Sequence, residues 1–306
     1  MASVTLQTVT VSSADGGTEA EFVPEANMVC TSLRHRGVEW LEQRRGLAAY
    51  VEQGKTMGIP LLHPWANRLD RLGYAVGGKV VSLPSGDARI RLDGDLPIHG
   101  VMPSFLRWEL LDAPDPATLK ARLRWTSSEL LELFPFTHEL ELQASVTEGQ
   151  LTMETTLRAT GSDQVPVAFG YHPYLRIPGT SRDTWQIKLG AFRRLVLDER
   201  KVPTGEREPV GQRSVELGDS SWDDLFDGLS VPARFEVAVG ETAVEVEFLR
   251  GYAFAQVFAP PGFDYISFEP MTAPANALNS GDGLHLVAPG EEYRAAFRVR
   301  LSDRSA

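Results

Sequence analysis

Two segments of the sequence place a titratable side chain where proton transfer can be tuned. His172 stands between Tyr171 and Tyr174 at the end of an apolar run, and Pro173 forces the backbone at His172 into an extended conformation. A histidine fixed in this way can be aimed at a substrate, and its surroundings can shift its pKa. The structural alternative is a buried histidine that bonds a backbone carbonyl.

The second segment contains a carboxylate. Glu269 ends the apolar stretch 265–268 and is followed by Pro270. Burial disfavours the ionised carboxylate and raises its pKa, which makes a stronger general base. The alternative is a structural carboxylate that pairs with Arg68, and the two interpretations are compatible.

A third segment offers groups that suit a sugar. Asn67 and Arg68 follow a proline-bounded apolar stretch that ends near Trp65. Arginine donates several hydrogen bonds, asparagine donates and accepts, and tryptophan presents a flat apolar face, as vicinal hydroxyls and C–H groups require. Alternatively, Arg68 pairs with Asp70 or a distant carboxylate, and Trp65 belongs to the core.

The remaining histidines carry weaker signals. Gly100 behind His99 allows a ligand to approach the backbone closely, although on these residues alone a hydrogen-bonded loop histidine is the preferred interpretation. His63 is predicted to be structural. His138, on the apolar face of a regular strand, is predicted to lie in the core.

The elements that position these residues are β-strands. Alternation of apolar and polar residues predicts a hairpin of residues 136–146 and 151–159, a second hairpin around 240–242, and a last strand over 293–301. Gly/Pro turns between such runs predict a large antiparallel β-sandwich. We expect one domain over residues 1–306, with a single short helix at 220–226.

Composition excludes several classes of partner. Against 30 Lys and Arg stand 41 Asp and Glu, a net charge of −11, which disfavours nucleic acid and anionic membranes. Cys30 is the sole cysteine, so an intrachain disulfide and a Cys-based zinc site are excluded, and a core position is expected. Without a visible signal peptide or an apolar run of about 20 residues, a cytoplasmic protein is predicted.

Taken in order, these segments resemble the aldose 1-epimerase (galactose mutarotase-like) family. The resemblance is carried by Asn67-Arg68, His99-Gly100, His172-Pro173-Tyr174, Pro203-Thr204-Gly205-Glu206, Asp223-Asp224-Leu225-Phe226, Glu269 with Pro274, and a Pro-Gly before the last strand. It implies an antiparallel β-sandwich that needs no metal or cofactor.

The resemblance also implies roles. Glu269 matches the catalytic base, His172 the catalytic acid and His99 a second active-site histidine. Arg68 and Asp223 match residues that hold sugar hydroxyls, and Asn67 and Trp65 join them as candidate substrate-binding residues. Asp223 is preferred to Asp224 because the family pattern places an aromatic residue three positions on, here Phe226.

The sequence differs from the family pattern around the base. Met271 stands where mutarotases usually have glutamine, Pro270 follows the base directly, and the Asn67-Arg68 pair is preceded by Pro64-Trp65. These differences concern the identity of the sugar more than the reaction.

The predicted activity is interconversion of the α and β anomers of a hexose, with a small sugar as the only partner and a monomer or homodimer as the assembly. One alternative, epimerisation of a hexose 6-phosphate, requires extra basic residues at the pocket, for which Arg71 and Lys79 are candidates. Another is a non-catalytic sugar sensor, which has no need of both Glu269 and His172. A third treats His99, His172 and Glu269 as a metal site.

Overall fold

Long antiparallel strands dominate the protein in this computed structural model, which describes residues 6–113 and 115–303. The largest sheet has nine strands. In spatial order they are β10 (Glu109–Leu111), β11 (Thr118–Trp125), β12 (His138–Thr147), β13 (Gln150–Ala159), β26 (Glu292–Ser302), β22 (Thr242–Arg250), β21 (Ala233–Val239), β16 (Gln186–Leu189) and β19 (Arg213–Glu216).

A seven-stranded sheet carries most of the residues discussed below. Its order is β18 (Pro203–Val210), β17 (Phe192–Leu197), β20 (Trp222–Asp227), β23 (Phe254–Ala259), β24 (Ser267–Met271), β15 (Gly170–Tyr171) and β5 (Leu61–Leu62). A four-stranded sheet contains β1 (Val9–Ser12), β2 (Thr18–Val23), β3 (Val29–His35) and β4 (Val38–Glu39).

Three strand pairs and short helices complete the described chain. The pairs are β6 (Gly73–Val76) with β7 (Lys79–Ser82), β8 (Ile90–Asp93) with β9 (Leu96–Val101), and β14 (Val165–Val167) with β25 (His285–Val287). The helices are α1 (Gly46–Gln53), α2 (Ser128–Leu133), α3 (Ala277–Ser280) and the 3-10 turns η1 (Pro24–Ala26), η2 (Pro103–Phe105) and η3 (Arg182–Thr184).

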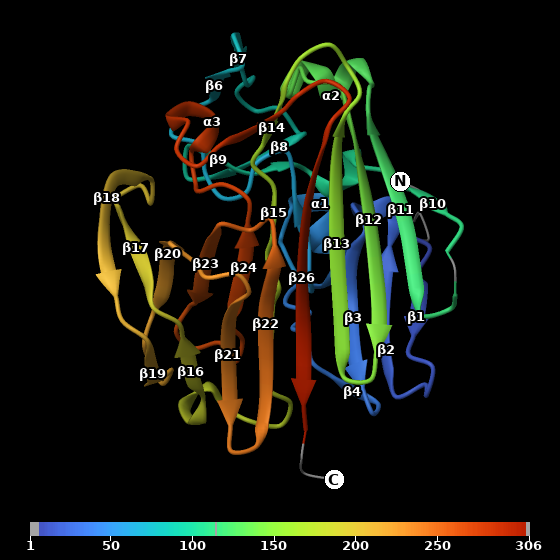
Figure 1. The fold of residues 1–306 in the computed structure, drawn as a ribbon, viewed down its shortest axis with the longest axis vertical. Coiled ribbons are helices and arrows are strands. Elements are labelled where there is room, and N and C mark those ends of the chain that lie inside the picture. Colours follow the sequence, from blue (N-terminus) through green and yellow to red (C-terminus); the bar gives the residue numbers. More distant parts are fainter. Residues whose placement is uncertain (1–5, 114, 304–306) are drawn as a thin grey trace.

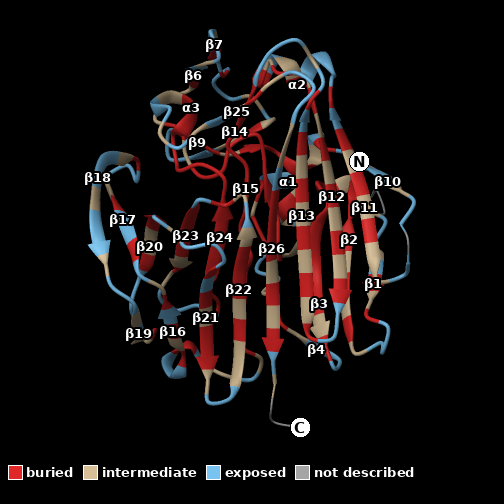
Figure 2. Ribbon diagram, viewed as in Figure 1, coloured by how far each residue is buried: buried red, intermediate tan, exposed pale blue. Residues whose placement is uncertain are grey.

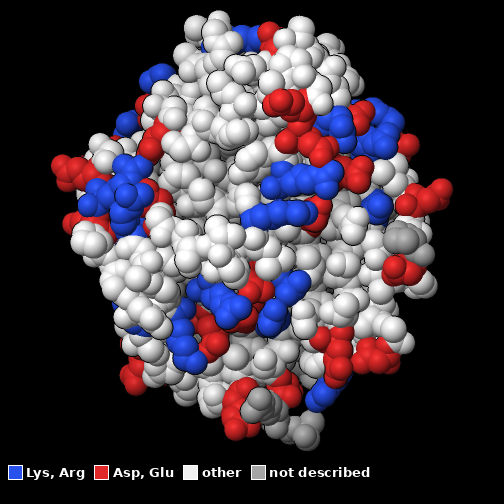
Figure 3. All heavy atoms as spheres, viewed as in Figure 1, with Lys and Arg blue, Asp and Glu red and all other residues white. Residues whose placement is uncertain are grey.

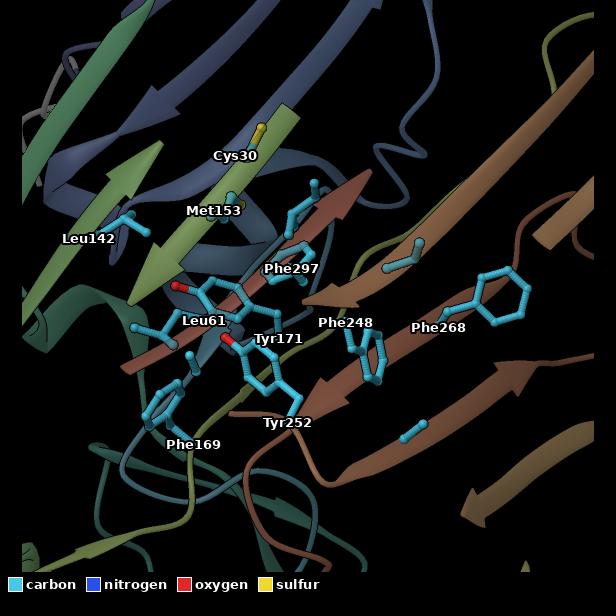
Figure 4. Close-up of a cluster of buried hydrophobic side chains, with 14 of the residues drawn as sticks. Cys30, Leu61, Leu142, Met153, Phe169, Tyr171, Phe248, Tyr252, Phe268 and Phe297 are labelled. Carbon is cyan, nitrogen blue, oxygen red and sulfur yellow. The ribbon is translucent and has the colours of Figure 1, made fainter. Parts of the chain in front are cut away.

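The sheets form two layers with an apolar core between them (Figure 1). Across the interface, the ring of Tyr171 on β15 lies 5.1 Å from that of Phe297 on β26, and Phe268 on β24 lies 5.6 Å from Phe235 on β21. Figure 4 shows Tyr171, Phe268 and Phe297 among the side chains between the strands, and Cys30 near them is fully buried, as predicted. The predicted antiparallel β-sandwich is therefore confirmed.

The alternating sequence patterns have become strands with one buried face. Along β12 and β13, buried and half-buried residues alternate (Figure 2), and the predicted hairpin closes with Thr147 opposite Gln150. The second hairpin, β21 with β22, and the last strand, β26, are also where the sequence predicts them. His63 and His138 are buried with their Nε2 atoms 2.9 Å apart, which confirms the structural prediction for both.

The helix predicted at residues 220–226 is wrong. Residues Trp222–Asp227 form strand β20, which pairs with β17 on one side and β23 on the other. A segment this short is decided by its tertiary partners rather than by its own propensity, because two neighbouring strands satisfy its backbone hydrogen bonds.

Charged residues of both signs lie side by side on the face shown in Figure 3. The guanidinium groups of Arg298 and Arg300 lie 3.5 and 3.3 Å from the Glu247 carboxylate, between the strands of the nine-stranded sheet. The acidic excess is therefore interspersed with arginines here. Within the described part of the chain, none of the helices has the length and apolar character needed to cross a membrane.

Candidate active site

A cavity of about 260 Å³ lies on the face of the seven-stranded sheet that points away from the core. Strand β24 shows how one strand can contribute to both the core and the cavity. Successive side chains of a strand point to opposite faces, so Phe268 packs on the nine-stranded sheet while Glu269 turns into the cavity. Strands β8 and β9 add Arg91 and His99 to its wall. The volume suits a single monosaccharide.

His172 and Glu269 meet at the base of this cavity. The imidazole Nε2 of His172 lies 3.2 Å from Glu269 Oε1, and both side chains are buried. The imidazole is held on its other edge, where Nδ1 lies 3.1 Å from the Ser267 hydroxyl. Its face stacks on the Tyr174 ring, with centroids 4.3 Å apart. The orientation of the imidazole is thus fixed from three sides.

Burial shifts the pKa of each member of this pair toward its uncharged form. Desolvation raises the pKa of Glu269 well above its ordinary value; the Asp223 carboxylate adds to the increase and Arg68 opposes it. Desolvation lowers the pKa of His172 to about 3, helped by the positive charges of Arg44 and Arg91. The carboxylate therefore becomes a stronger base and the imidazolium a stronger acid.

His99 lies beside the pair. Its ring is nearly perpendicular to that of His172, with centroids 5.8 Å apart. Burial and the charge of Arg91 lower the pKa of His99 well below its usual range, so the imidazole is neutral. Its Nδ1 is buried and has no hydrogen-bond partner among the described residues.

The backbone behind His99 requires glycine at position 100. Gly100 has φ +71°, and a Cβ there would lie 2.1 Å from the backbone oxygen of His63. His99 itself has φ +64°. Among the described residues, eight non-glycine residues have positive φ, and Arg44, Asn67 and His99 of these line the cavity. Such strained backbone tends to collect at functional sites.

A chain of hydrogen bonds holds the polar wall of the cavity. Arg68 donates from Nη1 to Asn67 Oδ1 (3.1 Å) and from Nε to Asp93 Oδ2 (3.1 Å). Asn67 Nδ2 donates to Gln256 Oε1 (3.3 Å), and Gln256 Nε2 donates to Asp223 Oδ1 (2.7 Å). The chain fixes donors and acceptors at set spacings, as recognition of several hydroxyls requires.

Six of the seven residues predicted for the site come together, and one does not. Asn67, Arg68, His99, His172, Asp223 and Glu269 all line the cavity. Trp65 is absent from the lining; it is 1% exposed and packs on Tyr74, which is the core position that the structural alternative predicts.

Other predicted neighbours of the site also lie elsewhere. Arg71 donates to Asn279, and Lys79 is 2.8 Å from the Asp163 carboxylate; neither lines the cavity. Asp224 is 3.4 Å from Arg194 and is likewise absent from the lining, unlike Asp223. Across residues 6–113 and 115–303, no three His, Cys, Asp or Glu side chains are arranged to hold a metal ion. The alternative that His99, His172 and Glu269 form a metal site is therefore not supported.

The sequence did not single out Arg44, Arg91 and Gln256, which line the cavity, or Ser267, which contacts His172. Gln256 and Ser267 could have been found from strand alternation, since Ser267 shares a face with Glu269. Arg44 lies two residues before α1 begins, and Arg91 lies on β8; no sequence motif marks either residue.

Comparisons with known proteins identify the family and the fold. The family model for aldose 1-epimerase matches residues 29–300. The uncharacterised protein YihR of Escherichia coli K12 is 24% identical over 276 residues, covering 83% of this chain and 86% of that protein. Among solved structures, the Slr1438 protein of Synechocystis sp. PCC 6803 has a TM-score of 0.78 at 24% identity, covering 97% of this chain and 96% of its own.

Two further structures have the same fold. A galactose mutarotase-like protein from Clostridium acetobutylicum has a TM-score of 0.82 at 19% identity, covering 97% of this chain and 98% of its own. Galactose 1-epimerase from Lactobacillus acidophilus has a TM-score of 0.73 at 14% identity, covering 97% and 99%. The family model spans most of the sequence and the galactose mutarotase-like sandwich spans the structure: the chain belongs to the aldose 1-epimerase family.

Proposed function

We propose that the protein is an aldose 1-epimerase that interconverts the α and β anomers of an aldohexose by opening and closing the sugar ring. One observation carries the proposal: the Glu269 carboxylate and the His172 imidazole lie 3.2 Å apart, buried, in a cavity of monosaccharide size. The family assignment supports a carbohydrate epimerase.

The reaction moves protons only. Glu269, ionised, takes the proton of the anomeric hydroxyl as the bond between C1 and the ring oxygen breaks, and His172, protonated, donates to that oxygen. The product is the open aldehyde; rotation about C1–C2 and closure on the other face reverse both transfers. No atom changes its oxidation state overall, so the chemistry requires no redox cofactor.

The pKa directions favour the step in this mechanism. Ring opening converts the pair from carboxylate and imidazolium to carboxylic acid and neutral imidazole. Burial raises the pKa of Glu269 and lowers that of His172, and both shifts stabilise the uncharged products of that conversion. The same shifts place the single proton of the pair mainly on Glu269, so the reaction starts from the less populated but more reactive form, in which the proton is on His172.

The surrounding residues have binding roles in this proposal. Neutral His99 offers a hydrogen bond near the ring oxygen, where charge develops as the ring opens. Arg68, Asn67 and Asp223 bind ring hydroxyls, and Gln256 joins Asn67 to Asp223.

Replacement of the base tests the proposal. Glu269→Gln keeps the size of the side chain and removes the base, so anomer exchange of glucose or galactose, followed by polarimetry, should fall by roughly 10²–10⁴-fold. Glu141→Gln, on the outer face of β12, is the matched control and should exchange anomers at the wild-type rate. Circular dichroism verifies both folds. Wild-type exchange by Glu269→Gln, or saturable sugar binding without exchange by the native protein, would overturn the assignment.

A further inference from the structure

Two arginines in the cavity have no acidic partner. Arg68 is paired with Asp93, but within the described residues no carboxylate lies within ion-pair distance of Arg44 or Arg91. Arg44 donates one side-chain hydrogen bond, from Nη1 to the Tyr174 hydroxyl (3.2 Å), and Arg91 donates one, from Nη1 to the Gly54 carbonyl (3.0 Å). The other N–H groups of both guanidiniums have no acceptor in the described part of the protein.

Both guanidiniums are held in place. The Arg44 group lies over the rings of Tyr174 and Tyr265, at 5.1 and 5.2 Å from their centroids. Arg91 is half-buried, and its hydrogen bond to the Gly54 carbonyl anchors it. Gly54 lies two residues before Thr56, and the Thr56 hydroxyl is 2.7 Å from the Tyr174 hydroxyl. The two arginines thus approach the same edge of the cavity, marked by Tyr174 and Thr56.

Two guanidinium groups that are partly desolvated and have no carboxylate partner in the described chain are electrostatically costly. Burial lowers the pKa of Arg91; Tyr174 and the Asp93 carboxylate oppose this shift, and the charges of Arg44 and Arg68 add to it. Guanidinium groups kept together and partly desolvated are stabilised by an anion that accepts their free N–H groups. Oxyanions such as phosphate and carboxylate match the planar donor geometry of arginine.

The position of Arg44 indicates which part of the sugar would carry the anion. Arg44 bonds the Tyr174 hydroxyl, which lies 3.3 Å from His172 Nε2. In the proposed reaction His172 protonates the ring oxygen, and the carbon bonded to that oxygen on the side away from C1 is C5, which bears C6. The region beyond His172 therefore accommodates the C6 substituent.

We propose that Arg44 and Arg91 form a subsite for an oxyanion at the C6 end of the aldose, so that the preferred substrate is an anionic sugar. This inference rests on the proposed function for its assignment to C6. The basic residues that the sequence suggested for such a substrate, Arg71 and Lys79, lie outside the cavity, which makes Arg71 a matched control.

Binding of a sugar that cannot react tests the subsite without the catalytic step. 1,5-Anhydroglucitol lacks the anomeric hydroxyl, and its 6-phosphate adds only the anion. By isothermal titration calorimetry at low salt, the 6-phosphate should bind at least about tenfold more tightly, because charge-assisted hydrogen bonds are strong. The difference should shrink as salt screens the charges.

Variants assign the preference to residues. Arg44→Met and Arg91→Met should each remove most of the preference for the 6-phosphate, Arg44→Lys should keep part of it, and Arg71→Met should keep all of it. Circular dichroism checks that each variant is folded. If a methionine variant does not fold, Arg44→Lys still tests the subsite, because it keeps the positive charge but removes the guanidinium geometry. Equal binding of the two ligands to the native protein, or a preference that survives in folded Arg44→Met and Arg91→Met, would overturn the proposal.

A kinetic comparison then identifies the anion. Anomer exchange by NMR is compared for glucose, glucose 6-phosphate and glucuronate, and a higher kcat/KM for either anion supports the subsite and names its group. A higher kcat/KM for glucose than for both overturns it and leaves the epimerase assignment intact. Tighter binding of the 6-phosphate analogue without exchange of any sugar supports the subsite and overturns the epimerase assignment.

Discussion

His172 follows β15 directly and Glu269 lies on β24, and the antiparallel pairing of these two strands brings imidazole Nε2 within 3.2 Å of carboxylate Oε1. The register pairs Gly170 with Met271, so each functional residue lies two positions from a backbone-paired residue. The sheet, rather than a loop, sets the separation of the proposed acid and base, which favours a rigid site.

The two groups should act as a unit. Glu269→Gln and His172→Gln are each expected to lower kcat by roughly 10²–10⁴-fold, and the double variant should be no slower than the slower single variant. The reason is that loss of either proton transfer blocks the same step. Stopped-flow polarimetry measures all three rates, and exposed His285→Gln on β25 is the control. Losses that multiply in the double variant would show that the residues act independently.

The pH dependence of kcat/KM should have widely separated limbs. The active pair holds one proton. A second proton enters only as the pH approaches about 3, because burial and the two arginines lower the pKa of His172. The single proton leaves only well above the ordinary pKa of a glutamic acid, because burial raises the pKa of Glu269. Activity measured from about pH 4.5 upward should therefore lack an acid limb near 6.5, the ordinary value for histidine. A limb at that value would mean that His172 titrates as a solvated group.

Glycine at position 100 should be required for stability. Gly100→Ala places a methyl group 2.1 Å from the His63 oxygen and imposes positive φ on alanine, so we expect a loss of about 2 kcal/mol or more in the free energy of unfolding. Gly94→Ala, in the turn between β8 and β9, has φ +64° with nothing within 4 Å, and should lose only about 1 kcal/mol. Urea denaturation compares the two variants. Equal losses would show that backbone strain alone, without the clash, decides the cost.

Loss of Gln256 should weaken substrate binding more than it slows the reaction. Gln256→Leu removes the bridge between Asn67 and Asp223, so KM should rise roughly tenfold while kcat changes less. Initial rates over a range of sugar concentrations separate the two constants. Gln186→Leu, on β16 of the other sheet, is the control. A fall in kcat with KM unchanged would place Gln256 in the chemical step instead.

The sequence predicts the sandwich well where a strand has one buried face. The hairpin of β12 and β13 extends over ten residues on each side, and its alternation leaves little ambiguity. The segment at Trp222–Asp227 is short and carries three aspartates, so its pattern fits helix and strand alike, and its neighbours β17 and β23 decide that it is a strand. The expectation of one domain over residues 1–306 stays a prediction.

The site is predictable in the parts that lie in compact motifs. Asn67-Arg68, His99-Gly100 and Glu269 are visible because polar residues interrupt apolar strands. Arg44 and Arg91 resemble any of the many surface arginines, and only the folded chain shows that they enter the cavity. Trp65 lies two positions before the cavity residue Asn67 but packs in the core, because the backbone here is not a regular strand and Asn67 has φ +57°.

The two unpaired arginines also act on the proposed acid. Arg44 and Arg91 both lower the pKa of His172, so a bound anion that neutralises them raises that pKa. An anionic sugar would thereby alter the strength of the acid that opens its own ring, whereas a neutral sugar would leave the charges of the two arginines, and their effect on the pKa of His172, unchanged. Rates for the two kinds of sugar would then differ for two reasons, affinity and acid strength, and the acid limb of the pH profile separates them.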